Sequence, residues 1–128
     1  MKPSAAIAPQ LAFRPACDED IPAVRALADD IWRRCYADLL PAGQVDHMLA
    51  AMYGAEALRR DLRDGIRIEL IEVAGEAVGY LAFGLVSTEG QVHLHKLYLK
   101  PEHHGRGIGQ AALAHVLASA ARSGAEAV

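Results

Sequence analysis

The chain has 128 residues and a formal net charge of −3, with 52% hydrophobic and 23% charged residues. This length can bury one sizeable core, and the composition argues against intrinsic disorder. Interspersed charges of both signs leave no broad basic surface for a nucleic acid, and no apolar run approaches the roughly 18 residues of a membrane-spanning helix. We therefore expect one folded domain over residues 1–128, with no nucleic-acid or membrane partner.

The two cysteines, Cys17 and Cys35, are too few for a disulfide framework. Residues 1–7 lack the apolar core of a secretion signal. We expect both cysteines to be reduced thiols in or near the core, and the protein to be cytoplasmic.

The N-terminal half predicts one strand followed by helices. Leu11–Arg14 is short, mostly apolar and followed by Pro15, which is typical of a strand. A helix is predicted over Asp20–Tyr36, because acidic residues and Pro22 stand at its start and apolar residues then recur every three or four positions. This apolar stripe consists of Ile21, Val24, Ala28, Ile31 and Cys35.

Two shorter helices are predicted after Pro41. The first carries one apolar face, made of Val45, Met48, Leu49 and Met52. The second carries Leu58 and Leu62, with Glu56 and Arg60 at the i,i+4 spacing of a helical ion pair. Asp64-Gly65 is expected to end this helical block.

From Ile66 the hydrophobic period changes to two, so Ile66, Ile68 and Leu70 predict a half-buried strand. Turns at 74–76 and 87–91 lead into two further strands, 78–86 and 92–99, which together make an antiparallel meander. A last helix, with Ile108, Ala112, Val116 and Ala120 on its buried stripe, should end at Ser123-Gly124, and residues 125–128 would begin another strand. This order of elements indicates one mixed α/β domain.

A glycine-rich turn, His104-Gly105-Arg106-Gly107-Ile108-Gly109, joins the third strand of the meander to the last helix. Glycines at 105, 107 and 109 allow positive φ and close approach, so several amides could converge on one anion at the positive end of the helix. The spacing matches neither a P-loop nor a dinucleotide fingerprint. Taken alone, the run is equally compatible with a flexible turn, and its position between strand and helix favours a pyrophosphate site.

The strand before this turn changes its alternation, because Val92 and Leu94 share one parity while Leu97 and Leu99 share the other. A β-bulge near His95-Lys96 would cause such a phase slip, and a strand buried on both faces would explain it equally well. A bulge would leave backbone N–H groups at Leu97 and its neighbours free for a ligand carbonyl.

These residues resemble a known family. Lys96–Pro101 followed by Gly105–Gly109 is similar to motif A of the GNAT superfamily of N-acetyltransferases, whose pattern is Gln/Arg-x-x-Gly-x-Gly/Ala, and the element order agrees. The resemblance implies a GNAT-like acyl-CoA N-acyltransferase fold, α/β with a mixed sheet. It also implies transfer of an acetyl group from acetyl-CoA to a primary amine of a small molecule.

In the resemblance, the amides of Leu97 and Leu99 pair with the pantetheine arm, and the glycine turn holds the pyrophosphate of coenzyme A. The implied cofactor-binding residues are Leu97, Tyr98, Leu99, His104, Gly105, Arg106, Gly107, Ile108, Gly109 and Gln110. His104 stands where the family usually has Gln or Arg, which can alter one contact of a site made mainly of backbone.

A weaker similarity covers Trp32, Tyr36, the segment 39–41 and the helix through Met48, which resemble the first two helices of bacterial polyamine-type acetyltransferases. In that group these helices line the acceptor pocket, so Trp32 and Tyr36 are implied acceptor-binding residues and the acceptor is implied to be polyamine-like. The alternative is that both pack on the sheet, which is favoured for Trp32.

Acetyl transfer to an amine requires a neutral nucleophile, a polarised thioester carbonyl and an acid for the leaving thiolate. The backbone N–H near Leu97 is the candidate polarising donor, and His93 and His95, which share one face, are the candidate bases, with Glu89 nearby. These histidines, with His103 and His104, lack the supporting ligands of a zinc site, so no metal is expected.

The family's usual acid is a tyrosine on the helix that follows a fifth strand, and that helix would fall after Val128. We therefore expect a GNAT domain that is C-terminally truncated, with an open edge on its fourth strand. Such an edge favours homo-oligomers or strand exchange. A non-catalytic coenzyme-A-binding or interaction fragment is the alternative function.

Overall fold

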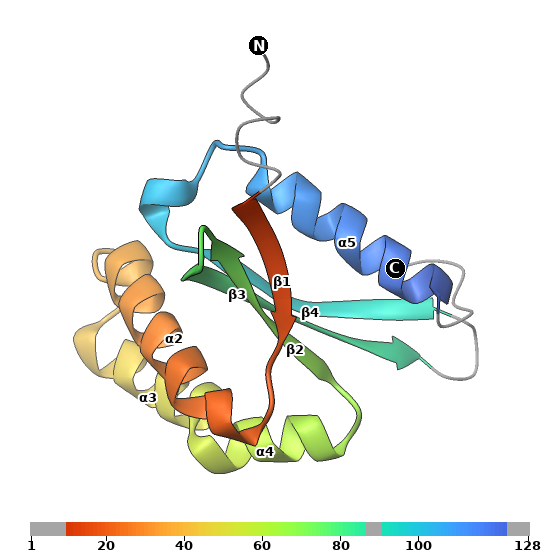
Figure 1. Cartoon of the computed structure of the whole chain (residues 1–128). Helices are drawn as coiled ribbons and strands as arrows, with labels where there is room; N and C mark the ends of the chain where they lie inside the picture. Colours follow the sequence, from red (N-terminus) through yellow and green to blue (C-terminus); the bar gives the residue numbers. More distant parts are fainter. Residues whose placement is uncertain (1–9, 87–90, 123–128) are drawn as a thin grey trace.

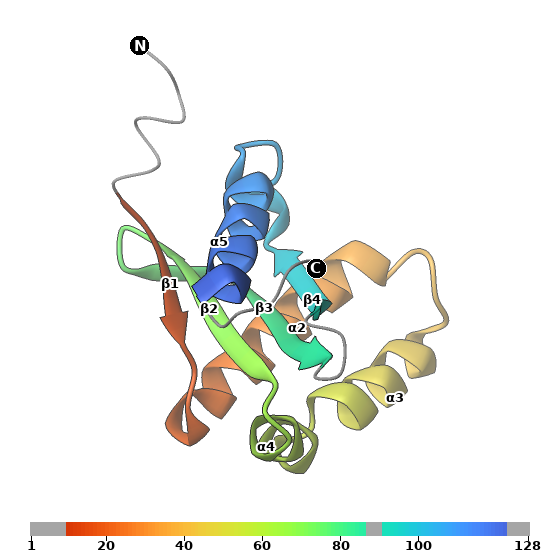
Figure 2. The same cartoon turned by 90° about the vertical axis from the view of Figure 1, so that its right-hand side faces the viewer.

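The computed structural model describes residues 10–86 and 91–122 and shows helices on both faces of a four-stranded sheet (Figures 1 and 2). In chain order the elements are β1 (Leu11–Pro15), the 3-10 helix η2 (Asp18–Asp20), α2 (Ile21–Tyr36), α3 (Ala42–Tyr53), α4 (Ala55–Arg63), β2 (Arg67–Val73), β3 (Glu76–Val86), β4 (Gln91–Leu99), the 3-10 helix η3 (Pro101–His103) and α5 (Ile108–Arg122). The strand order is β1-β2-β3-β4, and each neighbouring pair is antiparallel. The predicted α/β class and meander are confirmed.

The start of α2 follows from the residues before it. The Asp20 carboxylate accepts a hydrogen bond from the Cys17 N–H at 3.0 Å, and Pro22 suits the first helical turn. Of the predicted apolar stripe of α2, Ile21, Val24, Ala28 and Ile31 are buried, and Leu27 and Trp32 are buried with them. Cys35 is half-buried, but Cys17 is exposed, so its predicted place in or near the core is wrong; both thiols are free.

Helices α3 and α4 also lie where predicted, and Gly65, at φ +87°, ends the block. The ion pair predicted within α4 forms with different arginines from the one predicted. Glu56 accepts a hydrogen bond from Arg63 at 3.1 Å and lies 3.9 Å from Arg59, instead of pairing with Arg60. These side chains are exposed, so the exchange has little effect on stability.

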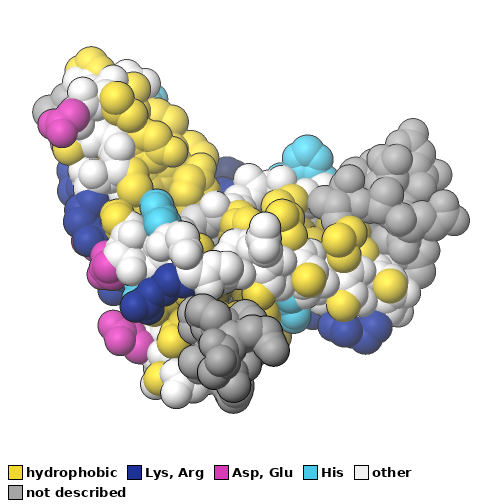
Figure 3. All heavy atoms as spheres, turned by 90° about the horizontal axis from the view of Figure 1, so that it is seen from above, with side chains coloured by type: hydrophobic (Ala, Val, Ile, Leu, Met, Phe, Trp, Pro, Cys, Tyr) yellow, Lys and Arg dark blue, Asp and Glu magenta, His cyan; other side chains and the backbone are white. Residues whose placement is uncertain are grey.

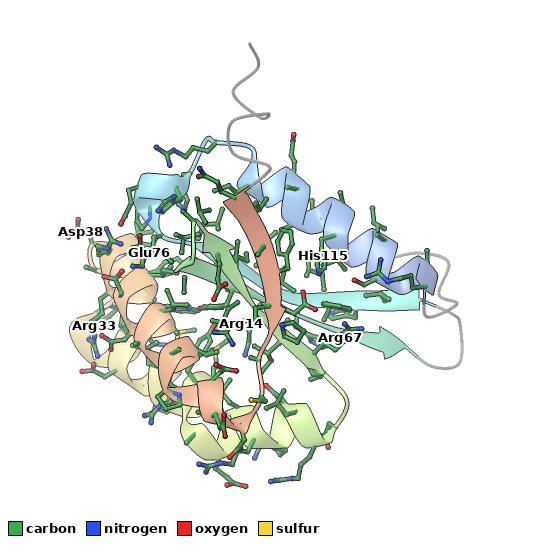
Figure 4. All side chains as sticks on the ribbon, in the orientation of Figure 1. Arg14, Arg33, Asp38, Arg67, Glu76 and His115 are labelled. Atoms are coloured by element: carbon green, nitrogen blue, oxygen red, sulfur yellow. The ribbon has the colours of Figure 1, made fainter. Side chains whose placement is uncertain are left out.

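Strand β2 is buried on both faces, which corrects the half-buried prediction. Ile68 and Leu70 pack toward α2, α3 and α4, while Ile71 packs toward α5. Glu69 is only 1% exposed, and it accepts a hydrogen bond from Nε2 of His115 on α5 at 2.6 Å. Figure 4 shows the His115 side chain between α5 and the sheet. A carboxylate can be buried when it has such a partner.

The two faces of the sheet carry two cores. One, beneath α2, α3 and α4, includes the aromatic residues Trp32, Tyr53 and Tyr80. The other, beneath α5, is mainly aliphatic and includes the predicted stripe of Ile108, Ala112, Val116 and Ala120. The β2–β3 hairpin turns at Ala74 and Gly75, both at positive φ, as a two-residue type I′ turn requires.

The end of the last helix at Ser123-Gly124, the turn over 87–90 and the strand from Ala125 lie outside the described residues. On α5, Leu113 and Leu117 project from the buried stripe and are 41% and 50% exposed. Within 10–86 and 91–122, the helices are too short or too polar to cross a membrane.

Candidate functional site

Strand β4 carries the predicted bulge. Ala82 pairs with Lys96 and Phe83 with Leu94, which leaves His95 as an extra residue on β4. Because of this extra residue, Val92 and Leu94 before the bulge face α5 together with Leu97 and Leu99 after it, although the two pairs differ in parity. Of the two interpretations of the sequence pattern, the bulge is therefore confirmed.

The outer edge of β4 presents free backbone groups. The Lys100 N–H donates to the Val78 carbonyl at 2.9 Å, so these opposite residues form a hydrogen-bonded pair. Hydrogen-bonded and non-hydrogen-bonded pairs alternate along an antiparallel ladder. Leu99, opposite Gly79, and Leu97, two positions earlier, therefore direct their N–H and C=O groups away from β3. In the described part of the chain, no strand pairs with this edge.

The glycine turn has the backbone that the sequence predicts at two of its three glycines. Gly105 and Gly107 have φ of +75° and +78°, a region that favours glycine. A Cβ atom at either position would meet nothing within 4 Å, so the backbone conformation and not packing requires glycine. Gly109 does not have a positive φ, because it already lies in the first turn of α5.

The amides of this turn lie at the N-terminus of α5. The first bond of the helix runs from the Ala111 N–H to the Gly107 carbonyl at 3.1 Å. The N–H groups of Ile108, Gly109 and Gln110 therefore precede the helical ladder and lie at its positive end. Arg106 is exposed, with its guanidinium 3.5 Å from the His103 ring. The backbone amides at the N-terminus of α5 thus form a site suited to an anion, next to the free edge of β4.

The predicted bases lie near the bulge, on the face opposite α5. The rings of His93 and His95 are 4.5 Å apart. Nearby, the Lys96 ammonium lies 3.9 Å from the Asp61 carboxylate and 4.5 Å from the ring centroid of Tyr53. Burial lowers the pKa of His95, and the neighbouring charge of His93 lowers it further. A histidine with a lowered pKa is neutral near pH 7 and can accept a proton.

The predicted acceptor residues have different surroundings. Trp32 is 5% exposed and packs against Tyr98, with 5.9 Å between ring centroids, so the prediction that it packs on the sheet is confirmed. Tyr36 is half-buried, 4.8 Å from the Trp32 ring. Figure 3, viewed from the end where the glycine turn lies, shows a hollow with hydrophobic side chains along the wall on the α2 and α3 side.

Sequence reasoning missed three side chains of this region, Tyr53, Asp61 and Lys96. They come from α3, α4 and β4, and no spacing along the chain connects them. The Tyr80 hydroxyl donates to that of Tyr53 at 2.9 Å, and burial raises the pKa of both phenols. Glu89 lies outside the described residues. Over 10–86 and 91–122, no group of three or more His, Cys, Asp or Glu side chains is placed to hold a metal.

A bulged strand with a free edge, followed by a glycine turn at a helix start, is the arrangement that the sequence resemblance implied. Residues 25–128 match the family model described as Acetyltransferase (GNAT) family. The chain belongs to the GNAT acetyltransferase family. Membership establishes acyl transfer from a coenzyme A thioester to an acceptor as the reaction class. A search of curated protein sequences gives no match.

Solved structures agree with the GNAT assignment. PaiA N-acetyltransferase from Thermoplasma acidophilum, in complex with coenzyme A, has a TM-score of 0.77 at 20% identity, over 90% of this chain and 74% of that one. RimL, a ribosomal-protein alpha-N-acetyltransferase in complex with coenzyme A, has a TM-score of 0.64 at 20% identity, over 90% and 66%. An aminoglycoside acetyltransferase from an uncultured soil sample has a TM-score of 0.66 at 17% identity, over 91% and 76%. Likeness at these identities shows the fold alone.

Proposed function

We propose that this protein is an N-acetyltransferase that moves the acetyl group of acetyl-CoA to the primary amine of a small molecule. The observation that carries this proposal is the outer edge of β4. Its free N–H groups at Leu97 and Leu99 lead to the anion-binding amides of Ile108, Gly109 and Gln110. This order suits a ligand with a polar arm that ends in a pyrophosphate.

The direction of β4 relates the two ends of this ligand. A strand rises about 3.3 Å per residue, so an arm laid from the turn along Leu99 and Leu97 leads toward the bulge at His95. The thioester would then lie beside the residues of β4 that can titrate. The glycine turn would hold the pyrophosphate at the opposite end.

The chemistry uses one backbone donor and one base. The Leu97 N–H would polarise the thioester carbonyl and stabilise the oxyanion that forms when the neutral amine attacks. A C–N bond forms, the C–S bond breaks, and coenzyme A leaves as its thiolate. His95 would accept the proton of the attacking amine, directly or through a water molecule.

Near the predicted acceptor residues, the carboxylates of Asp29, Asp30 and Asp46 are paired with Arg33 or Arg34. The Asp61 carboxylate, whose charge acts on His95, is likewise paired with Lys96. A polyamine-like acceptor therefore stays a prediction from the helices around Trp32 and Tyr36 alone. The acceptor panel must include amines of lower positive charge.

The test is thiol release from acetyl-CoA, followed with a thiol-reactive dye, with spermidine, a simple alkylamine and an amino acid as acceptors. We expect thiol release that depends on an acceptor and produces an equal amount of N-acetylated amine. Coenzyme A binding without release would support the non-catalytic alternative. No binding of coenzyme A at all would contradict both functions.

The open edge of β4 also bears on assembly. A partner strand would use the same N–H groups that we assign to acetyl-CoA, that of Leu97 to the thioester carbonyl and that of Leu99 to the pantetheine arm. Homo-oligomers or strand exchange through this edge would therefore compete with the ligand. Size-exclusion chromatography should show fewer oligomers when coenzyme A is added.

A further inference from the structure

His104 reaches back from the glycine turn to the end of β4. Its Nε2 lies 2.9 Å from the Leu99 carbonyl oxygen, five positions earlier in the chain. That carbonyl faces the outer edge of the sheet, because Leu99 occupies a non-hydrogen-bonded position opposite Gly79. The His104 side chain thus bonds a backbone group that the sheet leaves free.

The contact determines which nitrogen of the ring carries the proton. A carbonyl oxygen can only accept, so Nε2 of His104 must be the donor. An amide side chain could donate to the same oxygen, but an aliphatic side chain could not. Substitutions of His104 can therefore distinguish the effect of the hydrogen bond from the effect of side-chain size.

The turn needs such a contact because its own backbone is permissive. Gly105 and Gly107 lie within three positions after His104 and adopt positive φ, and glycine loses more conformational freedom on ordering than other residues. Two positions before His104, the Glu102 carboxylate accepts a hydrogen bond from Arg34 of α2 at 2.8 Å. The His104 side chain, directly before Gly105, bonds the end of the strand itself.

We propose that His104 is a positioning residue for the pyrophosphate. Its Nε2–H bond to the Leu99 carbonyl holds the glycine turn against the end of β4 and keeps the turn's amides in place before the ligand arrives. The bond uses one of the two lone pairs of the Leu99 carbonyl oxygen and leaves the Leu99 N–H available to the pantetheine arm. This inference rests on the proposed coenzyme A site.

The experiment measures the affinity of His104→Ala for three ligands by calorimetry. Coenzyme A contains both the arm and the pyrophosphate, ADP contains only the pyrophosphate, and pantetheine contains only the arm. Loss of one neutral hydrogen bond predicts about two- to tenfold weaker binding of coenzyme A and of ADP, by the same factor. The affinity for pantetheine should not fall.

Three further variants separate positioning from a general effect. His104→Gln keeps a donor and should restore most of the affinity, while His104→Leu keeps the bulk and should behave as His104→Ala. His103→Ala is the matched control, because this neighbouring histidine of the turn contacts Arg106 and not the strand. In steady-state kinetics, His104→Ala should raise KM for acetyl-CoA and leave kcat unchanged.

Equal coenzyme A affinity in wild type and His104→Ala would overturn the role of His104 and leave the proposed function intact. An equal loss in His103→Ala, or no rescue by His104→Gln, would overturn it as well. If the wild-type protein bound neither coenzyme A nor ADP, the proposed function itself would fail.

Discussion

The two ends of β4 present different kinds of groups, backbone amides at one end and side chains at the other. At the C-terminal end, the groups that we propose for ligand binding are backbone amides, held by the ladder to β3 and by the first turn of α5. At the bulge, they are the side chains of His93, His95 and Lys96, whose charges affect one another. Substitutions should therefore affect the first end through backbone conformation and added charge, and the second through protonation.

The largest expected effect is at the backbone end. Gly107→Asp places a side chain at φ +78° and a negative charge where the pyrophosphate should lie. Two like charges about 4 Å apart near a protein surface repel by about 4 kcal/mol, so affinity for coenzyme A should fall about 1,000-fold. Calorimetry with coenzyme A measures this loss.

Gly75→Asp is the matched control for Gly107→Asp. Gly75 has nearly the same φ, +83°, and also has nothing within 4 Å of a Cβ, but it lies in the β2–β3 hairpin. It should lose a similar amount of stability, about 1–2 kcal/mol, and keep its coenzyme A affinity. If Gly107→Asp bound coenzyme A within threefold of the wild type, the turn would not be the pyrophosphate site.

A smaller effect is expected at the side-chain end. His95→Gln keeps the size and polarity of the residue but cannot accept the proton of the attacking amine. We expect kcat to fall about 100-fold, the lower range for a general base, while coenzyme A affinity stays unchanged. His93→Gln, made on the neighbouring ring, should cost less; a greater loss there would make His93 the base.

The smallest effect is a change in pH dependence. His95 acts in its neutral form, so activity should be lost as pH falls through its pKa, which burial and the charge of His93 lower from the ordinary histidine value. Lys96→Met removes a positive charge and should move this acid limb to higher pH. Asp61→Asn removes a negative charge and should move it to lower pH. The pH profile of kcat/KM measures both shifts.

Arg25→Met is the control for Lys96→Met. It removes one positive charge from an exposed position on α2 and should leave the acid limb of the kcat/KM profile in place. Shifts of Lys96→Met and Asp61→Asn in the same direction would contradict the electrostatic explanation, because a loss of structure has no reason to follow the sign of the charge.

The same contrast explains what the sequence could predict. The bulge was visible as a change of parity between Leu94 and Leu97, and the anion-binding turn as glycines before an amphipathic helix. Both are local patterns, because the backbone and its periodicity produce them. The meander and the buried stripes of α2 and α5 were predictable for the same reason.

The remaining features depend on tertiary contacts. Glu69 alternates with apolar residues like any exposed strand residue, but it is buried and accepts a hydrogen bond from His115, 46 positions later. Figure 4 shows Arg67 near the same region, and its guanidinium lies 3.5 Å from the Glu69 carboxylate. Lys96 and Asp61 likewise come together from separate elements. Such pairs have no signature in one sequence.

The most direct test of the coenzyme A site is a titration of the 15N-labelled protein with coenzyme A, followed by amide NMR. We predict that shifts concentrate at the amides of Leu97, Leu99, Ile108, Gly109 and Gln110, with the amide of Arg25 in α2 unchanged. Saturable binding that shifted amides elsewhere and left the outer edge of β4 unperturbed would contradict the assignment of this edge and turn as the coenzyme A site.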